Sequence, residues 1–465
     1  MRFAWVLLGL SLAARAGAVP LKDVQRPATN DFILRAAAAE ADAIAQRHGL
    51  QVVARLAAAP DGDGLSVVLV RAASSAAPDA VLQDVRGGEP GALDIEAVVL
   101  AALPETGSEV KLDQRTRAIL GAVANPTETQ LGSQRLWTAY VRQPAADLLR
   151  LAEANQLYLG AGVVAIIDTG VDPSHPVLRD ALVPGYDFTR GQPGSASEWD
   201  DLLDQRTRAI LGQQAGTPLA GATGTRLGAA ATVILNGSSS TTIDPTTVPP
   251  DFGHGTMVAG VIHRVAPGAK IMPLKAFNAN GYASLFDVVQ AIYYAVDHGA
   301  KVVNMSFSVG AYSAELLRAI NYAARQGVTC VAAAGNDGQQ TIVYPAALGD
   351  AIGVASTTVR DYLSDFSNSG DDLVTLAAPG EDVVTTYPGG GWAIVSGTSF
   401  SAPWVSGAVA LFVDKNHAGQ QPARTNYFLA VDALAHSLPV HGAGHALSGR
   451  GRLDVKQALD GLETP

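Results

Sequence analysis

The stretch Gly162-Val163-Val164-Ala165-Ile166-Ile167, followed at once by Asp168, decides the fold of this chain. Its unbroken apolar character predicts a strand that is buried on both faces of a parallel sheet. Helix-like segments separate several further apolar runs, and such alternation predicts an α/β fold, a three-layer sandwich around a mainly parallel sheet. The further runs span 270–274, 301–305, 328–334, 351–355 and 373–377, and the helix-like segments include 284–298 and 313–326.

A small domain is expected before this sandwich, over residues 19–104. Its pattern predicts a strand, a helix, two strands, a helix and a strand, which is the ferredoxin-like α+β order. The predicted strands are 31–36, 50–56, 65–71 and 94–100, and the predicted helices are 37–48 and about 78–85.

Two less regular regions complete the expected organisation. Residues 105–145 are interpreted as a linker, followed by the larger domain over 146–461. Residues 190–250 are rich in Gly, Ser, Thr and Pro, which predicts a surface insertion in that domain. The decapeptide Leu-Asp-Gln-Arg-Thr-Arg-Ala-Ile-Leu-Gly occurs at 112–121 and again at 203–212, and two copies are too few for a repeat architecture.

Composition limits the classes of function. The chain has 465 residues, 48% of them hydrophobic and 16% charged, as in a globular protein with more than one folding unit. A net charge of -11 argues against a nucleic-acid partner, because phosphate binding needs clustered cations. Residues 1–18 have the features of a signal peptide, and no later apolar run has the ~20 residues of a membrane span. We therefore expect a secreted or periplasmic monomer, and Cys330, the only cysteine, excludes an internal disulfide.

Three separate segments each present a side chain suited to acyl transfer. Asp168 follows the first buried strand, and ligand sites of α/β sheets lie at the carboxyl ends of strands. His254 lies between two glycines, in a segment where a helix can begin, and histidine is the usual general base near neutral pH. Ser399 precedes the apolar helix expected over 402–413, so free backbone N–H groups surround it. Each residue also has an ordinary structural interpretation, as a turn cap, a surface histidine or a helix cap.

The region around the serine leaves some choice. Thr398 and Ser401 also carry hydroxyl groups in this segment, so its chemistry does not single out Ser399. Asn336 closes the strand that includes Ala333, Ala334 and Gly335, and its amide could donate to an oxyanion or simply form a turn.

Together these segments resemble the subtilisin-like serine proteases. The matching motifs are Ile167-Asp168-Thr169-Gly170, Gly253-His254-Gly255-Thr256 and Gly397-Thr398-Ser399, in that family's chain order, with the segment ending at Asn336 as a fourth. The resemblance covers about 157–460 and implies a catalytic triad of Asp168, His254 and Ser399, with Asn336 as the oxyanion donor. It also implies a substrate cleft lined by Ser306, Phe307, Ser308, Ala333, Ala334 and Gly335.

The resemblance also concerns maturation and cofactors. The first domain resembles the family's propeptide, which would inhibit the enzyme until cleavage between about 105 and 145. No cofactor is expected for the chemistry and no metal residue is assigned; the family frequently binds calcium, but no compact Asp-rich loop here locates a site. Protein or peptide substrates are expected, while an inactive peptide-binding relative and a peptide ligase remain alternatives.

Overall fold

The computed structural model describes residues 30–56, 65–73, 76–88, 92–102, 127–194, 196–202, 233–235, 248–417, 440 and 449–461. The predicted signal peptide, most of the predicted linker and both copies of the decapeptide lie outside these residues.

An eight-stranded sheet in the order β10-β9-β12-β8-β14-β15-β16-β17 forms the centre of the larger domain. All its pairs are parallel except β9 with β10. The predicted runs all form strands of this sheet, although β17 begins three residues later than expected. The strands are β8 (Val163–Asp168), β9 (Gly185–Asp187), β10 (Gln192–Gly194), β12 (Lys270–Lys275), β14 (Val302–Met305), β15 (Thr329–Ala333), β16 (Ala351–Thr357) and β17 (Leu376–Pro379).

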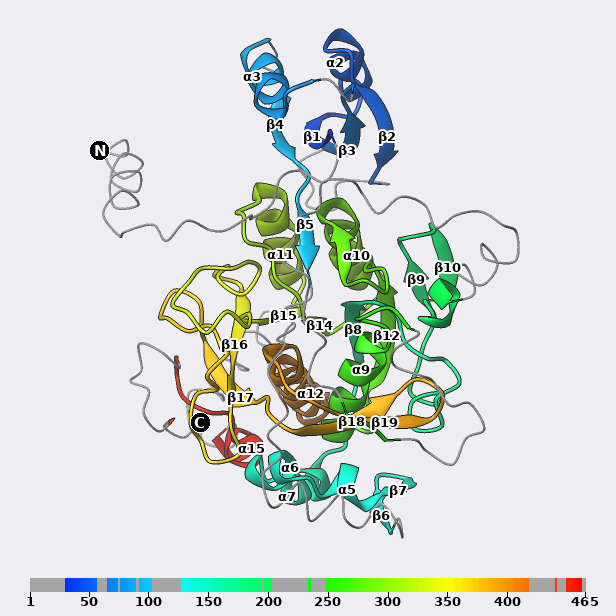
Figure 1. Cartoon of the computed structure of the whole chain (residues 1–465), viewed down its shortest axis with the longest axis vertical. Coiled ribbons are helices and arrows are strands. Elements are labelled where there is room, and N and C mark those ends of the chain that lie inside the picture. Colours follow the sequence, from blue (N-terminus) through cyan, green and yellow to red (C-terminus); the bar gives the residue numbers. More distant parts are fainter. Residues whose placement is uncertain are drawn as a thin grey trace.

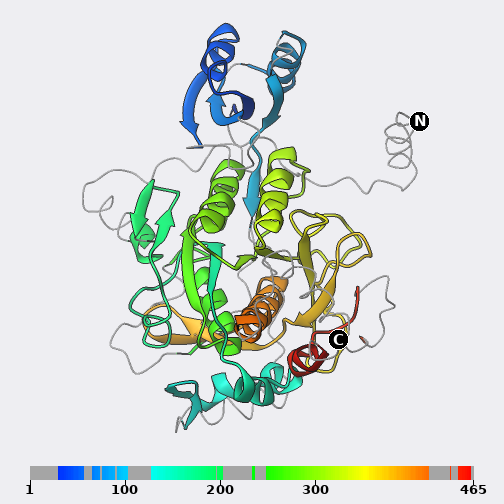
Figure 2. The ribbon, with the colours of Figure 1, turned by 180° about the vertical axis from the view of Figure 1, so that it is seen from behind.

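Helices cover both faces of this sheet (Figures 1 and 2). Val164 and Ile166 of β8 belong to the core beneath α9 (His254–Val265) and α12 (Thr398–His417). The alternate residues Ala165 and Ile167 belong to the core beneath α10 (Leu285–Asp297) and α11 (Ala314–Arg325). Because neighbouring strand residues point to opposite faces, each apolar run contributes to both cores. The predicted three-layer α/β sandwich is confirmed.

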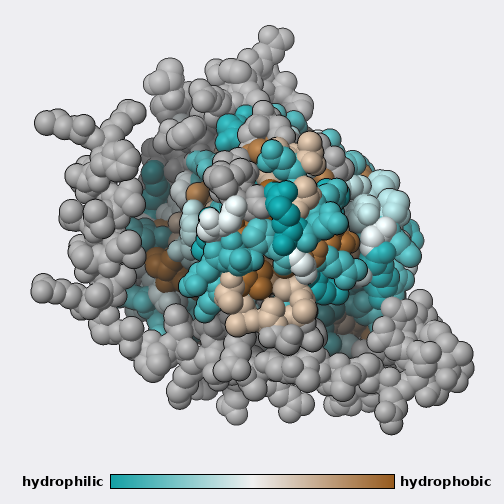
Figure 3. All heavy atoms as spheres, turned by 90° about the horizontal axis from the view of Figure 1, so that it is seen from above, coloured by the Kyte–Doolittle hydropathy of each residue, from teal (hydrophilic) through white to brown (hydrophobic). Residues whose placement is uncertain are grey.

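The first domain has the βαββαβ order that the sequence predicts. Its four-stranded sheet has the order β2-β3-β1-β4, and every pair is antiparallel. Its elements are β1 (Asp31–Ala37), α2 (Ala41–Arg47), β2 (Gln51–Arg55), β3 (Leu65–Arg71), α3 (Pro78–Gly88) and β4 (Ala92–Ala97). Seen from this end of the molecule, the described surface is mainly hydrophilic with small apolar areas (Figure 3).

A short strand connects the first domain to the larger one. β5 (Leu100–Ala102) pairs antiparallel with β13 (Tyr282–Ser284), which leads into α10. Both views show β5 passing between α10 and α11, below the first domain (Figures 1 and 2). The predicted last strand of this domain is therefore divided, with 92–97 in one sheet and 100–102 in another.

Residues 127–145, which we interpreted as part of the linker, belong to the core of the larger domain. They form the hairpin β6 (Glu128–Leu131) and β7 (Gln134–Trp137), then α5 (Thr138–Val141) and the start of α6 (Pro144–Leu148). Tyr140 is fully buried, and its hydroxyl donates to the Gly260 carbonyl over 2.6 Å. Burial of Leu131, Leu136 and Tyr140 supplies the physical reason: these apolar side chains complete the core beside α9.

The remaining elements complete the lower part of the domain. A three-stranded sheet joins β11 (Val233–Leu235), β19 (Gly391–Val395) and β18 (Val383–Tyr387), while α7 (Leu151–Leu157) packs on α15 (Val455–Gly461). Within the part of the chain described above, no helix has both the length and the apolar character needed to cross a bilayer.

Candidate active site

Three of the predicted site residues lie where neighbouring parallel strands end. Asp168 is the last residue of β8, Ser306 follows β14, and Asn336 follows β15 by three residues. β8 lies between β12 and β14, so the chain extends the sheet first on one side of β8 and then on the other. Such a switch point opens a crevice at the carboxyl ends of the strands. The topology therefore brings these side chains to one edge of the sheet.

Asp168 and His254 form a buried pair. Nδ1 of His254 lies 2.8 Å from Oδ1 and 3.0 Å from Oδ2 of Asp168, and each side chain is 1% exposed. The backbone N–H of Thr169 donates to Oδ1 of Asp168 over 2.7 Å, which fixes the carboxylate. A carboxylate on Nδ1 favours the tautomer that carries its proton there, leaving Nε2 as the basic atom.

Glycines allow the two segments to approach closely. A Cβ on Gly255 would lie 2.0 Å from the Gly170 carbonyl oxygen, so the first turn of α9 contacts the loop after Asp168 directly. Gly170 has φ +105°, and a Cβ there would lie 2.5 Å from the carbonyl oxygen of Ala196. Side chains at either position would separate His254 from Asp168.

Ser399 lies in the first turn of α12 and is fully buried. Its hydroxyl donates to the Ser306 carbonyl over 3.2 Å, while the Ser306 hydroxyl donates to the Ser399 carbonyl over 2.8 Å. The ring of the next residue, Phe400, has its centroid 5.5 Å from that of His254. The serine is thus held between the end of β14 and the helix that begins at His254.

The two alternative hydroxyl groups have other environments. Thr398 donates from Oγ1 to Oδ1 of Asn336 over 2.8 Å, and Ser401 Oγ is buried without a hydrogen-bond partner among the described residues. Asn336 Oδ1 also accepts from the Thr398 N–H over 2.9 Å, so the Nδ2 donor faces away from Thr398. This Nδ2 is buried and has no partner in the described part of the chain.

The residues predicted to line a cleft are mostly buried. Phe307, Ala333 and Ala334 are 0% exposed, and the Phe307 ring packs on Phe277 at 5.1 Å between centroids. Contacts of these three residues with a substrate would therefore come from their backbones. Gly335 is buried too, and Ser308 is partly exposed.

Glu198 is a further residue at this site, and the sequence analysis did not single it out. It is 1% exposed and accepts hydrogen bonds from the side chains of Thr169 and Thr256, each over 2.7 Å. Burial raises the pKa of Glu198 to about 7, and the charge of Asp168 acts in the same direction. Its segment lies at the start of the predicted surface insertion, so that part is not on the surface. No local pattern distinguishes this glutamate from exposed ones.

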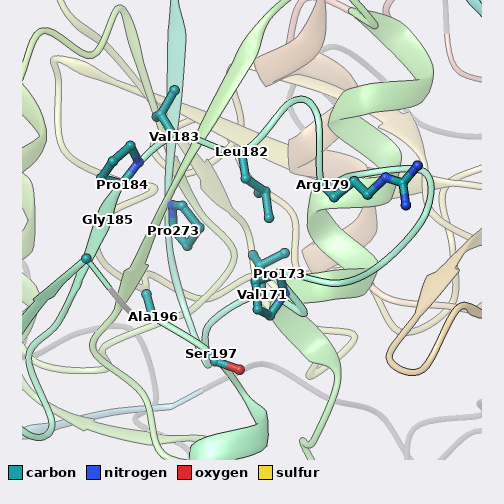
Figure 4. A pocket seen from close by; sticks show the side chains of 11 residues that line it. Val171, Pro173, Arg179, Leu182, Val183, Pro184, Gly185, Ala196, Ser197 and Pro273 are labelled. Carbon is teal, nitrogen blue, oxygen red and sulfur yellow. The ribbon is translucent and has the colours of Figure 1, made fainter. Parts of the chain in front are cut away.

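A cavity of about 310 Å³ lies behind the loop after Asp168. Apolar side chains including Val171, Leu182 and Pro273 gather around it, and the Arg179 guanidinium is directed away from them (Figure 4). Asp168, His254 and Ser399 do not line it. This cavity therefore lies apart from Asp168, His254 and Ser399. Among the described residues, no three His, Cys, Asp or Glu side chains are grouped so that they could hold a metal ion.

Comparisons with known proteins agree on the family. Residues 160–445 match the profile described as "Subtilase family". The chain is 32% identical over 302 residues to a thermophilic serine proteinase of Bacillus sp. strain AK1, covering 64% of this chain and 62% of that protein. It is 31% identical over 319 residues to thermitase of Thermoactinomyces vulgaris, covering 68% of this chain and 96% of thermitase.

Solved structures show the same fold. The crystal structure of fervidolysin from Fervidobacterium pennivorans, a keratinolytic enzyme related to subtilisin, superimposes with a TM-score of 0.65 at 22% identity. That match covers 95% of this chain and 62% of fervidolysin. A lanthipeptide protease matches with a TM-score of 0.51 at 22% identity, covering 69% of this chain and 93% of that one.

The chain belongs to the subtilase family of serine endopeptidases. It spans 62% of the length of both the Bacillus proteinase and fervidolysin.

Proposed function

We propose that this protein is a secreted serine endopeptidase with the triad Asp168, His254 and Ser399, matured by removal of its first domain. The observation that carries the proposal is the buried hydrogen bond between Asp168 and His254, together with the buried Ser399, whose neighbour Phe400 packs on the His254 ring. An inactive relative would have no need to retain this geometry in a buried site.

The proposed reaction proceeds through an acyl-enzyme. Nε2 of His254 takes the proton of the Ser399 hydroxyl as its oxygen attacks the peptide carbonyl, and later returns it to the leaving amine. Asp168 orients the imidazole and stabilises its protonated form. A water molecule then attacks the ester. Nε2 of His254 takes a proton from this water and returns it to the Ser399 oxygen as the acid product leaves.

Asn336 supports the tetrahedral intermediate in this proposal. Its Nδ2 donor is buried and unpartnered among the described residues, while its oxygen is held by Thr398. A donor kept in this state can bind the oxyanion without reorganisation. The backbone N–H of Ser399, in the first turn of α12, is the second donor.

The proposed inhibition by the first domain is supported by its interface. Arg35 of β1 binds Glu315 of α11 over 2.8 Å, with side-chain exposures of 1% and 2%. Glu96 of β4 accepts from the Ser313 hydroxyl over 2.5 Å and from the Ala314 N–H over 3.0 Å, at the amino end of the same helix. A carboxylate at this position stabilises the positive end of the helix dipole. Together with the pairing of β5 and β13, these contacts hold the first domain beside the peptidase domain.

The proposal is tested with the purified full-length protein and its Ser399→Ala variant. Each is incubated with an unstructured protein substrate and with a fluorophosphonate, and its intact mass is measured. We expect the wild type alone to lose its first domain, to take up the label and to cut the substrate.

Three outcomes would change the proposal. Loss of the first domain by Ser399→Ala protein expressed alone would exclude self-processing. A wild type that neither labels nor cuts after its first domain has been removed would favour the inactive, peptide-binding alternative. If the wild type forms ligated instead of hydrolysed products when an amine acceptor is added, the protein would be a peptide ligase.

A further inference from the structure

Glu198 connects the two segments that carry the catalytic aspartate and histidine. Its Oε1 accepts from Thr169, the neighbour of Asp168, and from the Thr256 N–H over 3.2 Å. Its Oε2 accepts from the hydroxyl of Thr256, which lies two residues after His254. One carboxylate thus binds both the end of β8 and the first turn of α9.

The segment of Glu198 is itself anchored on the same loop. The Val171 N–H donates over 2.9 Å to the carbonyl of Ala196, which lies two residues before Glu198. Asp201, three residues after Glu198, binds the buried Nζ of Lys275 over 2.8 Å. The same Nζ donates to the Thr169 carbonyl over 2.7 Å. Residues 196–202 therefore form a clamp on the loop that follows Asp168.

Thr169 links this clamp to the histidine. Its Oγ1 donates to Glu198 and accepts from the Gly255 N–H over 3.1 Å, next to His254. A hydroxyl that loses its acceptor can turn, and its bond to Gly255 then weakens. Removal of the Glu198 carboxylate would therefore release contacts on both sides of the pair formed by Asp168 and His254.

We propose that Glu198 is a positioning residue for the triad, which holds Asp168 and His254 in register through Thr169 and Thr256. The inference rests on the proposed function, because it assumes that the pair performs catalysis. Displacements of about 1 Å among catalytic groups can cost 10²-fold in rate. The contacts of Glu198 should therefore affect turnover more than substrate binding. Glu198 itself touches no reacting atom in this arrangement.

The charge of Glu198 adds a pH-dependent component. With a pKa of about 7, it is protonated in mildly acidic solution and ionised above neutral pH. When ionised, it favours the positive imidazole that forms as Ser399 attacks, and it adds to the effect of Asp168. The charged and titratable groups around it come from several segments. They are Asp168 at the end of β8, Asp172 in the loop after β8, His254 on α9, Lys275 on β12, Tyr387 on β18 and Asp201 on its own segment.

The test compares Glu198→Ala and Glu198→Gln with the wild type, using kcat and KM for a peptide substrate between pH 5.5 and 9. Glu198→Ala should lose about tenfold or more in kcat at every pH, with KM within about twofold, because positioning acts on the transition state. Glu198→Gln keeps an oxygen for Thr169 and should recover most of this loss at pH 5.5. Above pH 7 it should remain several-fold below the wild type, because it lacks the charge.

Arg190→Met is the matched control. Arg190 lies outside the clamp and binds Asp187 over 2.9 Å and, within the clamp, Asp201 over 2.8 Å. If Glu198 only stabilised the fold, both Arg190→Met and Glu198→Ala would lower the unfolding temperature, and both would leave kcat unchanged. In the Ser399→Ala background, the low-field NMR signal of the proton on His254 Nδ1 should shift in Glu198→Ala and not in Arg190→Met.

The outcomes separate this inference from the proposed function. Wild-type kcat in both Glu198 variants at every pH would overturn the inference, while labelling of the wild type would leave the proposed function intact. If Glu198→Ala does not fold, the inference is tested by the ratio of wild-type kcat to Glu198→Gln kcat. A ratio that stays near one between pH 5.5 and 9 overturns it. A wild type that neither labels nor cuts would remove the basis of both.

Discussion

The two polar atoms of the Asn336 amide have different roles, one in the structure and one in the proposed chemistry. Oδ1 accepts two hydrogen bonds from Thr398, and Nδ2 is buried without a partner among the described residues. An unpartnered buried donor costs stability in the resting protein. In the proposed mechanism this cost is recovered when the oxyanion forms, so the donor favours the transition state over the ground state.

Asn336→Asp separates these two roles. The variant retains an oxygen for Thr398 and loses the Nδ2 donor. We expect kcat to fall by about 10²- to 10³-fold, a magnitude that comes from subtilisin itself, with KM changed by less than about threefold. Steady-state kinetics measures both constants, and thermal unfolding in the Ser399→Ala background checks the fold. Wild-type kcat in this variant would show that Asn336 is a turn residue.

At the scale of elements, α11 binds the first domain through several polar side chains. At its amino end Glu96 accepts a hydrogen bond from the Ala314 N–H, and its residue Glu315 binds Arg35 in a fully buried ion pair. Arg318 of the same helix also binds Glu315, over 3.0 Å, and Asp94 of β4, over 3.3 Å. Since these pairs connect β1 and β4 to one helix, the interface depends on the orientation of that helix.

Arg35→Met should weaken retention of the cleaved first domain. Loss of one partner of a buried pair is costly, but Arg318 still neutralises Glu315, so we expect a weakening of about 10- to 100-fold. The measurement is the recovery of peptidase activity on serial dilution of the processed protein. Arg55→Met is the control, because Arg55 pairs with Asp42 at an exposed site in the same domain. Equal dilution curves for the wild type and Arg35→Met would contradict this role of the pair.

At the scale of the whole molecule, the boundary of the larger domain lies earlier than residue 146. Tyr140 is 0% exposed, its ring lies 5.0 Å from that of Trp392, and its hydroxyl binds the carbonyl of Gly260. The Gln143 side chain donates to the Val384 carbonyl over 2.7 Å and accepts from the Val384 N–H over 2.9 Å. Residues 127–145 thus link α9 with the sheet formed by β11, β19 and β18.

Tyr140→Ala should lower the free energy of unfolding by about 3–5 kcal/mol, because it removes a large buried ring. Tyr140→Phe should cost only about 1 kcal/mol, the typical contribution of one hydrogen bond. Urea unfolding of both variants in the Ser399→Ala background measures these differences. Unchanged stability in Tyr140→Ala would support a detachable linker that extends to 145.

Local patterns were sufficient for the elements that carry the triad motifs. The apolar run before Asp168 specifies a strand buried on both faces, and the carboxyl ends of parallel strands meet at one edge by geometry alone. For that reason the sequence could place Asp168 and Asn336 at one edge of the sheet, whereas Ser399 joined them only through the resemblance to the subtilisin-like proteases. β3 likewise has the bounds expected from the sequence, 65–71.

Contacts between distant segments decided the rest. The pairing of β5 with β13, the packing of Tyr140 on α9 and the placement of Glu198 between Thr169 and Thr256 all join residues far apart in the chain. Such contacts leave no periodic signal, because a short polar or mixed segment has the same local preferences whether it faces solvent or a core. By itself the sequence determined the family motifs and the central sheet. Only tertiary packing decided which part of the predicted linker belongs to the domain core and which part of the predicted insertion belongs to the site.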